Sequence, residues 1–257
     1  MENFYDVLFE VSNEDRYKIL LQLAETPMNV TQLSKIIGLS LTETSRHLSR
    51  LCEVGLTQKE VEGLYNVSSF GKTFLSQLSG TEFISMHREY FNNHSLTCLP
   101  LEYIGRLGEL NNTVFVDDVM VVFKNIENMM QTAEEYIWRI TDRFLMLLLP
   151  NILSATKRGV GYKLVYPRDI VFPPDVKLTA ELRESRDNGL FSAKSMETSC
   201  VFLTMSEKEV AALSFPTLDG RFEYWGFTST DEQVHRWCKD LFQHYWEKGT
   251  PSPYNIW

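Results

Sequence analysis

The sequence has few cysteines, and none of them stand at metal-binding spacing. Its four cysteines, Cys52, Cys98, Cys200 and Cys238, are scattered over 257 residues without a Cys-x-x-Cys pair. Structural zinc sites place cysteines only a few residues apart, and disulfide-stabilised domains carry them more densely. The pattern therefore predicts neither a zinc site nor a disulfide framework, and it favours a reducing compartment.

Long apolar runs are also missing. The longest, "FLMLLL" at residues 144–149, is far shorter than the roughly 20 residues that a membrane-spanning helix needs. The first residues, "MENFYDVLFE", are acidic, whereas a secretory signal begins with basic residues. We therefore expect a cytoplasmic protein without a membrane partner.

Positive charge is scarce. The formal net charge is −9, and the residues up to Ser68 include six basic and ten acidic side chains. Nonspecific affinity for nucleic acid comes mainly from Lys and Arg that neutralise phosphates. The composition therefore argues against strong nonspecific binding to nucleic acid in either part of the chain.

Helical periodicity dominates the first 55 residues. Apolar side chains between Asn13 and Glu25 fall on one side of a helix, and "TPMN" ends it. Thr31 is the expected cap of a second, short helix that ends at Gly38. In the next stretch, "TETSRHLSRLCEVG", Thr44, Leu48 and Leu51 recur at helical spacing and are expected to face inward.

The opposite face of that third helix is polar and partly basic. "LTQKEVEGLYNVS" follows it and gives two short alternating runs around "EG", which is a hairpin signal. Helix, helix, tight turn, helix and hairpin is winged-helix order. This order favours DNA binding, while a winged helix used for protein contacts remains the alternative because this part of the chain is acidic.

The strings "GLS" at 38–40 and "SRHL" at 45–48 resemble those around the recognition helix of ArsR-like winged-helix repressors. The resemblance implies that the groove- and phosphate-facing positions of this helix are Thr42, Ser45, Arg46, His47 and Arg50. Lys59 is the only cation of the expected wing, beside Glu60 and Glu62. The Cys and His clusters of metal-sensing members are missing, so no metal or other cofactor is expected.

Residues 70–92 keep an apolar helical period and are expected to form a connecting or dimerising helix, with a kink at Gly80. Farther on, "EYIWRITDRF", "LMLLLPNILSATKRG" and "VGYKLVYP" predict a β-α-β unit with parallel strands. More strands are expected at "LFSAKSME", "SCVFLTMS", "EVAALSFP" and "RFEYWGFT". A helix capped by Thr230 and Gln233 then follows.

This second part resembles the effector half of archaeal regulators of the methanogenesis-regulatory family and, more distantly, the sensor domain of TrmB-like regulators. The resemblance rests on "ITDRF", "GVGYKLVYP" and "LFQHYWEKG". It implies a phospholipase-D-like fold without catalysis. That enzyme class needs a histidine followed two residues later by lysine, and none of the five histidines has this neighbour. We therefore expect no enzyme.

Polar side chains at predicted strand ends are the candidate ligand site. Open α/β sheets bind ligands at such ends, where this sequence has Arg139, Asp142, Arg143 and Thr228. Two neighbouring arginines suit a small anionic effector. An ion-pair network without a pocket is the alternative. A metal held by His87, His94 and Cys98 is disfavoured by their irregular spacing.

The sequence thus predicts an α+β winged helix-turn-helix domain followed by an α/β domain with a phospholipase-D-like, mixed sheet. The expected boundaries are 1–68 for the DNA-binding domain, 69–112 for a helical linker or dimerisation segment, and 113–257 for an effector-sensing domain. We expect a homodimeric regulator that binds double-stranded DNA. The alternative is a protein-interaction adaptor that does not bind DNA specifically.

Overall fold

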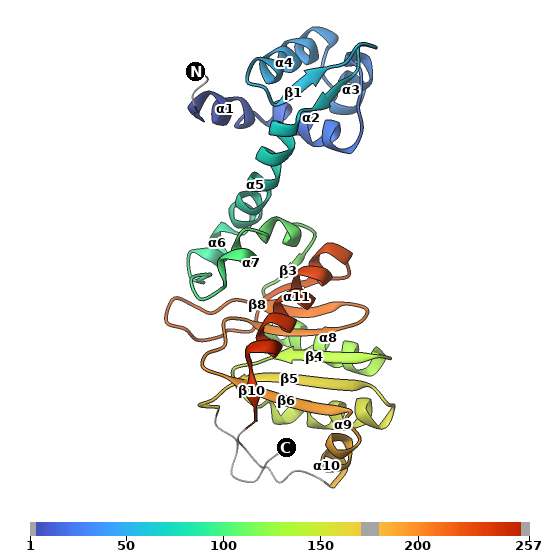
Figure 1. Ribbon diagram of the computed structural model, residues 1–257, viewed down its shortest axis with the longest axis vertical. Coiled ribbons are helices and arrows are strands. Elements are labelled where there is room, and N and C mark those ends of the chain that lie inside the picture. Colours follow the sequence, from blue (N-terminus) through green and yellow to red (C-terminus); the bar gives the residue numbers. More distant parts are fainter. Residues whose placement is uncertain (1–3, 171–179, 253–257) are drawn as a thin grey trace. The chain divides into compact units, whose positions relative to one another are not determined.

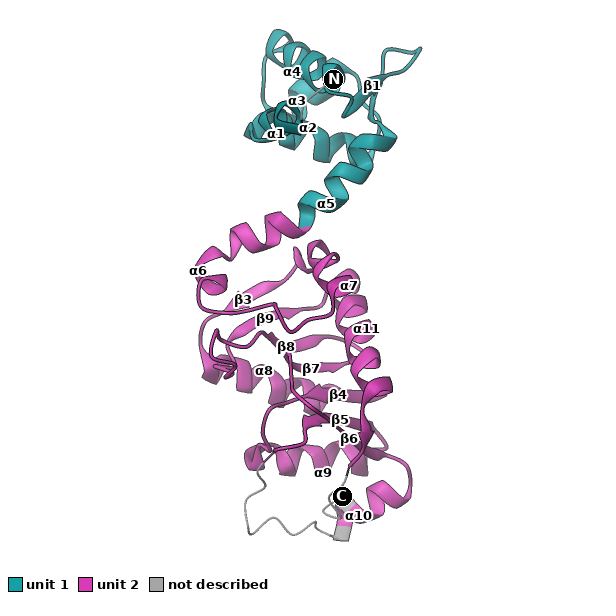
Figure 2. Ribbon diagram, turned by 60° about the vertical axis from the view of Figure 1, so that its left-hand side comes forward, with its two compact units in different colours: residues 1–79 teal, residues 80–257 magenta. Residues whose placement is uncertain are grey.

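The computed structural model describes residues 4–170 and 180–252 of the chain. The chain divides into two compact units, residues 1–79 and residues 80–257 (Figure 2). Unit 1 and unit 2 each have hydrophobic cores of their own. The boundary falls within residues 69–112, so the segment expected to be a separate linker is shared between the two units.

Unit 1 is a winged helix-turn-helix domain. Four helices precede a two-stranded antiparallel hairpin (Figure 1): α1 (Phe4–Val11), α2 (Glu14–Glu25), α3 (Val30–Ile37), α4 (Leu41–Glu53), β1 (Thr57–Lys59) and β2 (Tyr65–Val67). The three predicted helices and the hairpin are confirmed. Helix α1 was not predicted.

Hydrogen bonds at the helix ends explain where α3 and α4 begin. The prediction that Thr31 caps α3 is wrong, because Asn29 accepts from the Gln32 N–H and the Gln32 side chain accepts from the Asn29 N–H. Ser40 and Glu43 make the same reciprocal pair at the start of α4. Each capping box satisfies backbone N–H groups that would otherwise lack partners.

The inward stripe of α4 is confirmed. Thr44, Leu48 and Leu51 are each 0% exposed, and the two leucines belong to a core shared with Leu20 and Leu33. Gly38 ends α3 with a φ of 81°, a conformation that suits glycine. Burying each of these leucines contributes about 1.5–3 kcal/mol, so the core holds α4 with its polar face outward.

Helix α5 (Ser69–Met86) begins in unit 1 and ends in unit 2. It continues through Gly80, and the break in the helix predicted over residues 70–92 falls at His87 instead. Short helices follow: α6 (Arg88–Phe91), α7 (Leu101–Ile104) and the 3-10 helix η1 (Leu107–Leu110).

Unit 2 is built on an eight-stranded mixed sheet in the order β10-β6-β5-β4-β7-β8-β9-β3. Its strands are β3 (Val114–Val116), β4 (Tyr136–Ile140), β5 (Gly161–Pro167), β6 (Phe191–Met196), β7 (Phe202–Ser206), β8 (Val210–Ser214), β9 (Gly226–Ser229) and β10 (Thr250–Pro251). The predicted β-α-β unit is confirmed, since β5 pairs in parallel with both β4 and β6. All other pairings in the sheet are antiparallel.

Helices cover both faces of this sheet (Figure 1). One core contains apolar side chains of α11 (Glu232–Lys248) together with Trp138 and Ile140 of β4. The other contains side chains of α8 (Val119–Thr132) and α9 (Leu149–Lys157) together with Ile137 of the same strand. Alternate residues of β4 therefore enter opposite cores, as the pleat of a strand requires.

The remaining helices are η2 (Met146–Leu148) and α10 (Ala180–Asp187). The predicted terminal helix is α11, but its predicted cap is wrong: Asp231 accepts from the backbone N–H groups of Gln233 and Val234. Pro150 lies in the first turn of α9, where a missing N–H is tolerated. Strands β3 and β10 and helices α8 and α10 were not predicted.

Two glycines of α5 allow a test of the packing. A Cβ on Gly71 would overlap the Leu56 carbonyl oxygen, whereas a Cβ on Gly80 would meet only ordinary neighbours, the nearest at 3.5 Å. We expect Gly71→Ala to destabilise unit 1 by about 1–3 kcal/mol through overpacking. Gly80→Ala is the matched control and should stabilise the helix by up to about 1 kcal/mol. Urea unfolding followed by far-ultraviolet circular dichroism measures both, and equal midpoints would contradict the close approach at Gly71.

Candidate nucleic-acid interface and ligand site

The outward face of α4 is the candidate nucleic-acid interface. Thr42, Ser45, Arg46 and Ser49 are exposed along it, while Thr44 and Leu48 face the core. An α-helix with a polar, exposed face of this kind has the size and shape to enter the major groove of DNA. The capping box at Ser40 fixes where this face begins.

His47 was predicted to face outward, and this prediction is wrong. The residue is only 8% exposed, and within the described structure its Nδ1 atom is buried without a hydrogen-bond partner. Burial lowers the pKa of His47, and the nearby Arg16 and Arg46 lower it further. The imidazole therefore belongs to the packing between α4 and the core of unit 1 and not to the exposed face.

Arg50 has a structural contact that the sequence did not reveal. Its Nη2 atom lies 3.1 Å from Oε1 of Glu10, whose Oε2 atom lies 2.9 Å from Nε of Arg16. The Glu10 side chain is only 8% exposed. We call these three residues the Glu10 triad. It joins α1, α2 and α4.

Phe9 covers this triad. Its ring centroid lies 5.8 Å from the guanidinium carbon of Arg16 and 5.7 Å from that of Arg50. A ring at this distance attracts a guanidinium and shields it from water. The Arg50 side chain is still 44% accessible, but its guanidinium is paired with Glu10.

Arg46 differs from Arg50 because no acidic partner is found for it in the described parts of the chain. It is exposed at the centre of the polar face, one turn before Arg50. Its guanidinium is therefore available to an external acceptor. Of the two arginines predicted to contact DNA, the geometry favours Arg46.

The hairpin gives little positive charge. Lys59 is exposed at the end of β1, and its Nζ atom lies 5.6 Å from the centroid of the Tyr65 ring. Glu60, which follows it, accepts a hydrogen bond from the Asn66 side chain at 2.6 Å. Lys59 is thus the cation of this hairpin that could contact a phosphate. The neighbouring Glu60 carboxylate would weaken such a contact, because it repels the phosphate.

In unit 2, Arg139 is buried on β4 without a carboxylate. It is 3% exposed, and it donates from Nε to Oγ1 of Thr204 at 3.1 Å and from Nη1 to the Tyr162 hydroxyl at 3.2 Å. Its Nη2 atom is buried and has no hydrogen-bond partner among the described residues. A buried cation is costly unless an anion pairs with it.

A small cavity lies beside this guanidinium. It measures about 10 Å³ and is lined by Arg139, Arg143 and Tyr162 together with apolar side chains. The structure thus places two of the predicted ligand residues at one cavity. Its volume corresponds to roughly one water molecule, so only a small group fits beside Arg139 in this conformation.

Asp142 and Arg143 pair with one another next to that cavity. The Arg143 Nε atom donates to Oδ2 of Asp142 at 3.0 Å, and the Tyr224 hydroxyl donates to the same carboxylate at 3.0 Å. Tyr224 has a φ of 68°, a left-handed conformation that costs energy for a residue with a side chain. Asp142 therefore takes part in an ion-pair network, which was the alternative expected for it.

Thr228 does not join this group, so its predicted place in the ligand site is wrong. Its hydroxyl donates to the Val210 carbonyl at 2.8 Å. Strand β9 runs antiparallel to β4, since β7, β8 and β9 are successively antiparallel. Thr228, near the end of β9, therefore lies level with the beginning of β4. Arg143 follows the other end of β4, so the two residues lie at opposite ends of the strands.

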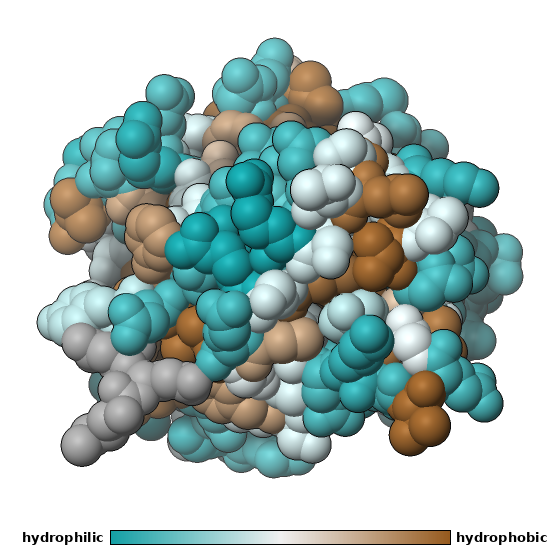
Figure 3. Space-filling model, turned by 90° about the horizontal axis from the view of Figure 1, so that it is seen from above, coloured by the Kyte–Doolittle hydropathy of each residue, from teal (hydrophilic) through white to brown (hydrophobic). Residues whose placement is uncertain are grey.

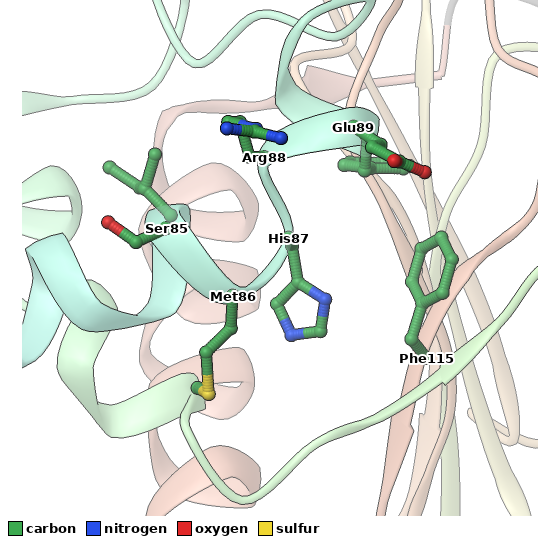
Figure 4. A pocket seen from close by; sticks show the side chains of 8 residues that line it. Ser85, Met86, His87, Arg88, Glu89 and Phe115 are labelled. Carbon is green, nitrogen blue, oxygen red and sulfur yellow. The ribbon is translucent and has the colours of Figure 1, made fainter.

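A larger, more open pocket lies where α5 ends. It measures about 610 Å³, and Figure 4 shows the His87 ring between Met86 and Phe115 within it. Burial lowers the pKa of His87. His94 lies elsewhere, stacked on Tyr90 with ring centroids 3.7 Å apart. Over residues 4–170 and 180–252, no group of three metal-ligating side chains converges.

The described helices include none with the length and apolar character needed to cross a membrane.

Residues 13–59 match the family model described as "Bacterial regulatory protein, arsR family". The match extends from the cap of α2 to the end of β1 and contains the whole of α3 and α4. No curated protein sequence matches the chain.

Several solved structures are distantly similar. TrmBL2, described as an archaeal chromatin protein with a novel mode of DNA binding, is 17% identical over 97% of this chain and 94% of its own, with a TM-score of 0.45. The phospholipase D family member Nuc from Salmonella typhimurium is 11% identical over 49% of this chain and 87% of its own, with a TM-score of 0.35. Polyphosphate kinase from Porphyromonas gingivalis is 13% identical over 53% of this chain and 23% of its own, with a TM-score of 0.33.

Proposed function

We propose that this chain is a DNA-binding transcription regulator that places α4 in the major groove. The observation that carries the proposal is the exposed polar face of α4, with Arg46 at its centre lacking an ion-pair partner among the described residues. This face lies in a winged helix-turn-helix whose residues 13–59 match the arsR-family model. In such domains the second helix of the motif reads base edges, while neighbouring elements contact the backbone.

Arg46 is the residue proposed to read a base. An arginine recognises guanine by donating two hydrogen bonds to its O6 and N7 atoms. Thr42, Ser45 and Ser49 provide hydroxyl groups for phosphates or bases on the same face. With few cations on the surface, specific base contacts contribute a larger share of the affinity than phosphate neutralisation does.

We further propose that two copies of the chain act together. One short helix reads only a few base pairs, and a two-fold dimer reads two half-sites about one DNA turn apart. Large apolar side chains remain exposed on unit 1: Phe4 is 62%, Tyr5 71% and Phe70 50% accessible. Figure 3 shows hydrophobic patches among hydrophilic side chains on one face of the molecule. The proposed contact uses helix α5 and the side chain of Phe70 in its first turn.

Unit 2 is proposed to sense a small monovalent anion at Arg139. The buried guanidinium of Arg139 supplies a positive charge, and its Nη2 atom has no hydrogen-bond partner among the described residues. The partly exposed Arg143 lies at the same cavity. An anion matches the charge, and the volume of about 10 Å³ limits the group beside Arg139 to roughly the size of one water molecule. Larger effectors require the cavity to widen at Arg143.

We also infer kinship with the methanogenesis-regulatory family, with a phospholipase-D-like second unit. The support is the resemblance of "ITDRF", "GVGYKLVYP" and "LFQHYWEKG" to that family. The proposed function has no catalytic step, because none of the five histidines is followed two residues later by lysine.

The second candidate function is a protein-interaction adaptor. It is favoured by the acidic charge of unit 1 and by its exposed aromatic side chains. An adaptor uses the same α4 face without base recognition, so selection against genomic DNA separates the two functions.

Arg46→Ala is expected to weaken binding to a selected genomic DNA fragment by about 1–3 kcal/mol, or about 5- to 150-fold, through loss of a base contact. Lys18→Ala is the charge-matched control, because Lys18 lies on α2 and pairs with Glu14. Gel-shift titration measures both. Equal losses of DNA affinity in the two variants would show that Arg46 contributes only its charge and no base contact. A genomic selection that enriches no fragment would favour the adaptor.

Light scattering of the purified full chain is expected to show a dimer at micromolar concentration. Phe70→Ser should shift it toward monomer, because the substitution removes an exposed ring from the proposed contact. Leu218→Ser is the control, since Leu218 is 72% exposed on unit 2. A wild-type monomer that still binds DNA specifically would contradict the dimer proposal.

A melting screen against small carboxylates and inorganic anions tests the effector site. An anion at a hundredfold excess over its dissociation constant should stabilise the wild-type chain by about 2.7 kcal/mol. Arg139→Met should abolish the shift because it removes the buried cation at similar volume. Arg221→Ala should retain the shift, because Arg221 pairs with Asp219 on the surface. If no anion moves the wild-type midpoint, or if Arg139→Met keeps the shift, the site is wrong.

A further inference from the structure

Two cysteines that are 102 residues apart in the sequence lie against one another in unit 2. The Cys200 thiol lies 3.0 Å from the Cys98 carbonyl oxygen, and the Cys98 thiol lies 3.7 Å from the Cys200 carbonyl oxygen. Each sulfur therefore reaches the main chain of the other residue. This reciprocal arrangement brings the two side chains together between the backbone segments that carry them.

Both segments are held in place. The segment of Cys98 joins α6 to α7, and its Ser95 N–H donates to the Pro216 carbonyl at 2.8 Å. Leu99, next to Cys98, is only 4% exposed. Cys200 is 6% exposed and precedes the fully buried Val201 and β7. The contact between the thiols is thus fixed by packing on both sides.

The two thiols differ in accessibility and acidity. Cys98 is exposed, whereas Cys200 is buried beneath it. A hydrogen bond from Cys98 lowers the pKa of Cys200 to about 7, and the same contact raises the pKa of Cys98. Thiolates are the reactive form of cysteine. At neutral pH the pair therefore combines a nucleophilic sulfur with a neighbouring thiol that can resolve its oxidised form.

We propose that Cys98 and Cys200 are a reversible oxidation site, which hydrogen peroxide closes to a disulfide and a dithiol reopens. The Cys200 thiolate attacks the O–O bond and takes up one oxygen as a sulfenic acid, while the other oxygen leaves as hydroxide and accepts a proton to become water. The Cys98 thiol then attacks the Cys200 sulfur. An S–S bond forms, and the sulfenic oxygen leaves as a second water with the thiol proton.

The disulfide would tie the segment after α6 to the segment that leads into β7. Both segments belong to unit 2, so oxidation would restrain two parts of that unit that are far apart in the sequence. The inference rests on the geometry of unit 2 alone. It holds whether or not unit 1 binds DNA.

The test is treatment of the reduced full-length protein with stoichiometric hydrogen peroxide, alkylation of the remaining thiols and peptide mapping. We expect a cross-linked peptide that contains Cys98 and Cys200 and is lost on incubation with dithiothreitol. Cys52 and the fully buried Cys238 should stay reduced during the peroxide treatment, so that both are alkylated once the protein is unfolded. Alkylation of both Cys98 and Cys200 after peroxide, or sulfinic acid at Cys200 without a cross-link, would overturn the proposal.

Cys98→Ser should reduce the cross-link to background. The Cys200 sulfenic acid should then persist, and dimedone should label it. Cys238→Ser is the control and should retain the cross-link. The wild-type peptide map decides the question even where a variant does not fold. An unoxidised Cys200 in the Cys98→Ser variant, together with a sulfenic acid at Cys98 in the Cys200→Ser variant, would contradict the assigned nucleophile.

Discussion

A buried carboxylate determines how helix α4 is held with its polar face exposed. Glu10 lies between the guanidinium groups of Arg16 and Arg50, so one negative charge joins α1, α2 and α4. Removing one member of such a group leaves an uncompensated charge, which costs more than the intact group contributes. Because Arg50 serves this purpose, Arg46 is left as the unpaired cation at the centre of the exposed face. The proposed role of Arg46 in base recognition follows from this division of roles.

Most of unit 1 could be predicted from the sequence because its signals are local. The spacing of Thr44, Leu48 and Leu51 set the orientation of α4, and Gly38 marked the end of α3. His47 lies at the border between the polar and apolar sides of α4, where periodicity alone could not assign it. The contact between Arg50 and Glu10 spans 40 residues, and no local pattern reports such a distance.

Strands β4 to β9 of unit 2 were also visible, since most of them are rich in β-branched and aromatic residues. Apart from the parallel pair β4 and β5, their directions were not visible, because a strand has the same pattern in parallel and antiparallel pairing. Arg139 and Arg143 were grouped correctly at one cavity, because both belong to β4 and the loop that follows it. Thr228 was assigned to the wrong end of the strands, because β9 runs in the opposite direction. Helix α8 escaped notice because "VMVVF" reads equally well as a strand. The contact of Cys98 with Cys200 depends on tertiary packing and gave no signal in the spacing of the cysteines.

The sheet of unit 2 recruits its edge strands from far along the chain. Phe115 of β3 pairs with Phe227 of β9, and Thr250 of β10 pairs with Ser195 of β6. Unit 1 joins elements that are neighbours in sequence, and such local contacts form quickly while distant ones must wait for the chain between them. During synthesis the winged helix can therefore be complete on the ribosome before the sheet has its outer strands. A nascent chain that ends before β9 leaves the hydrogen-bonding edge of β8 open, and open edges are sites of aggregation.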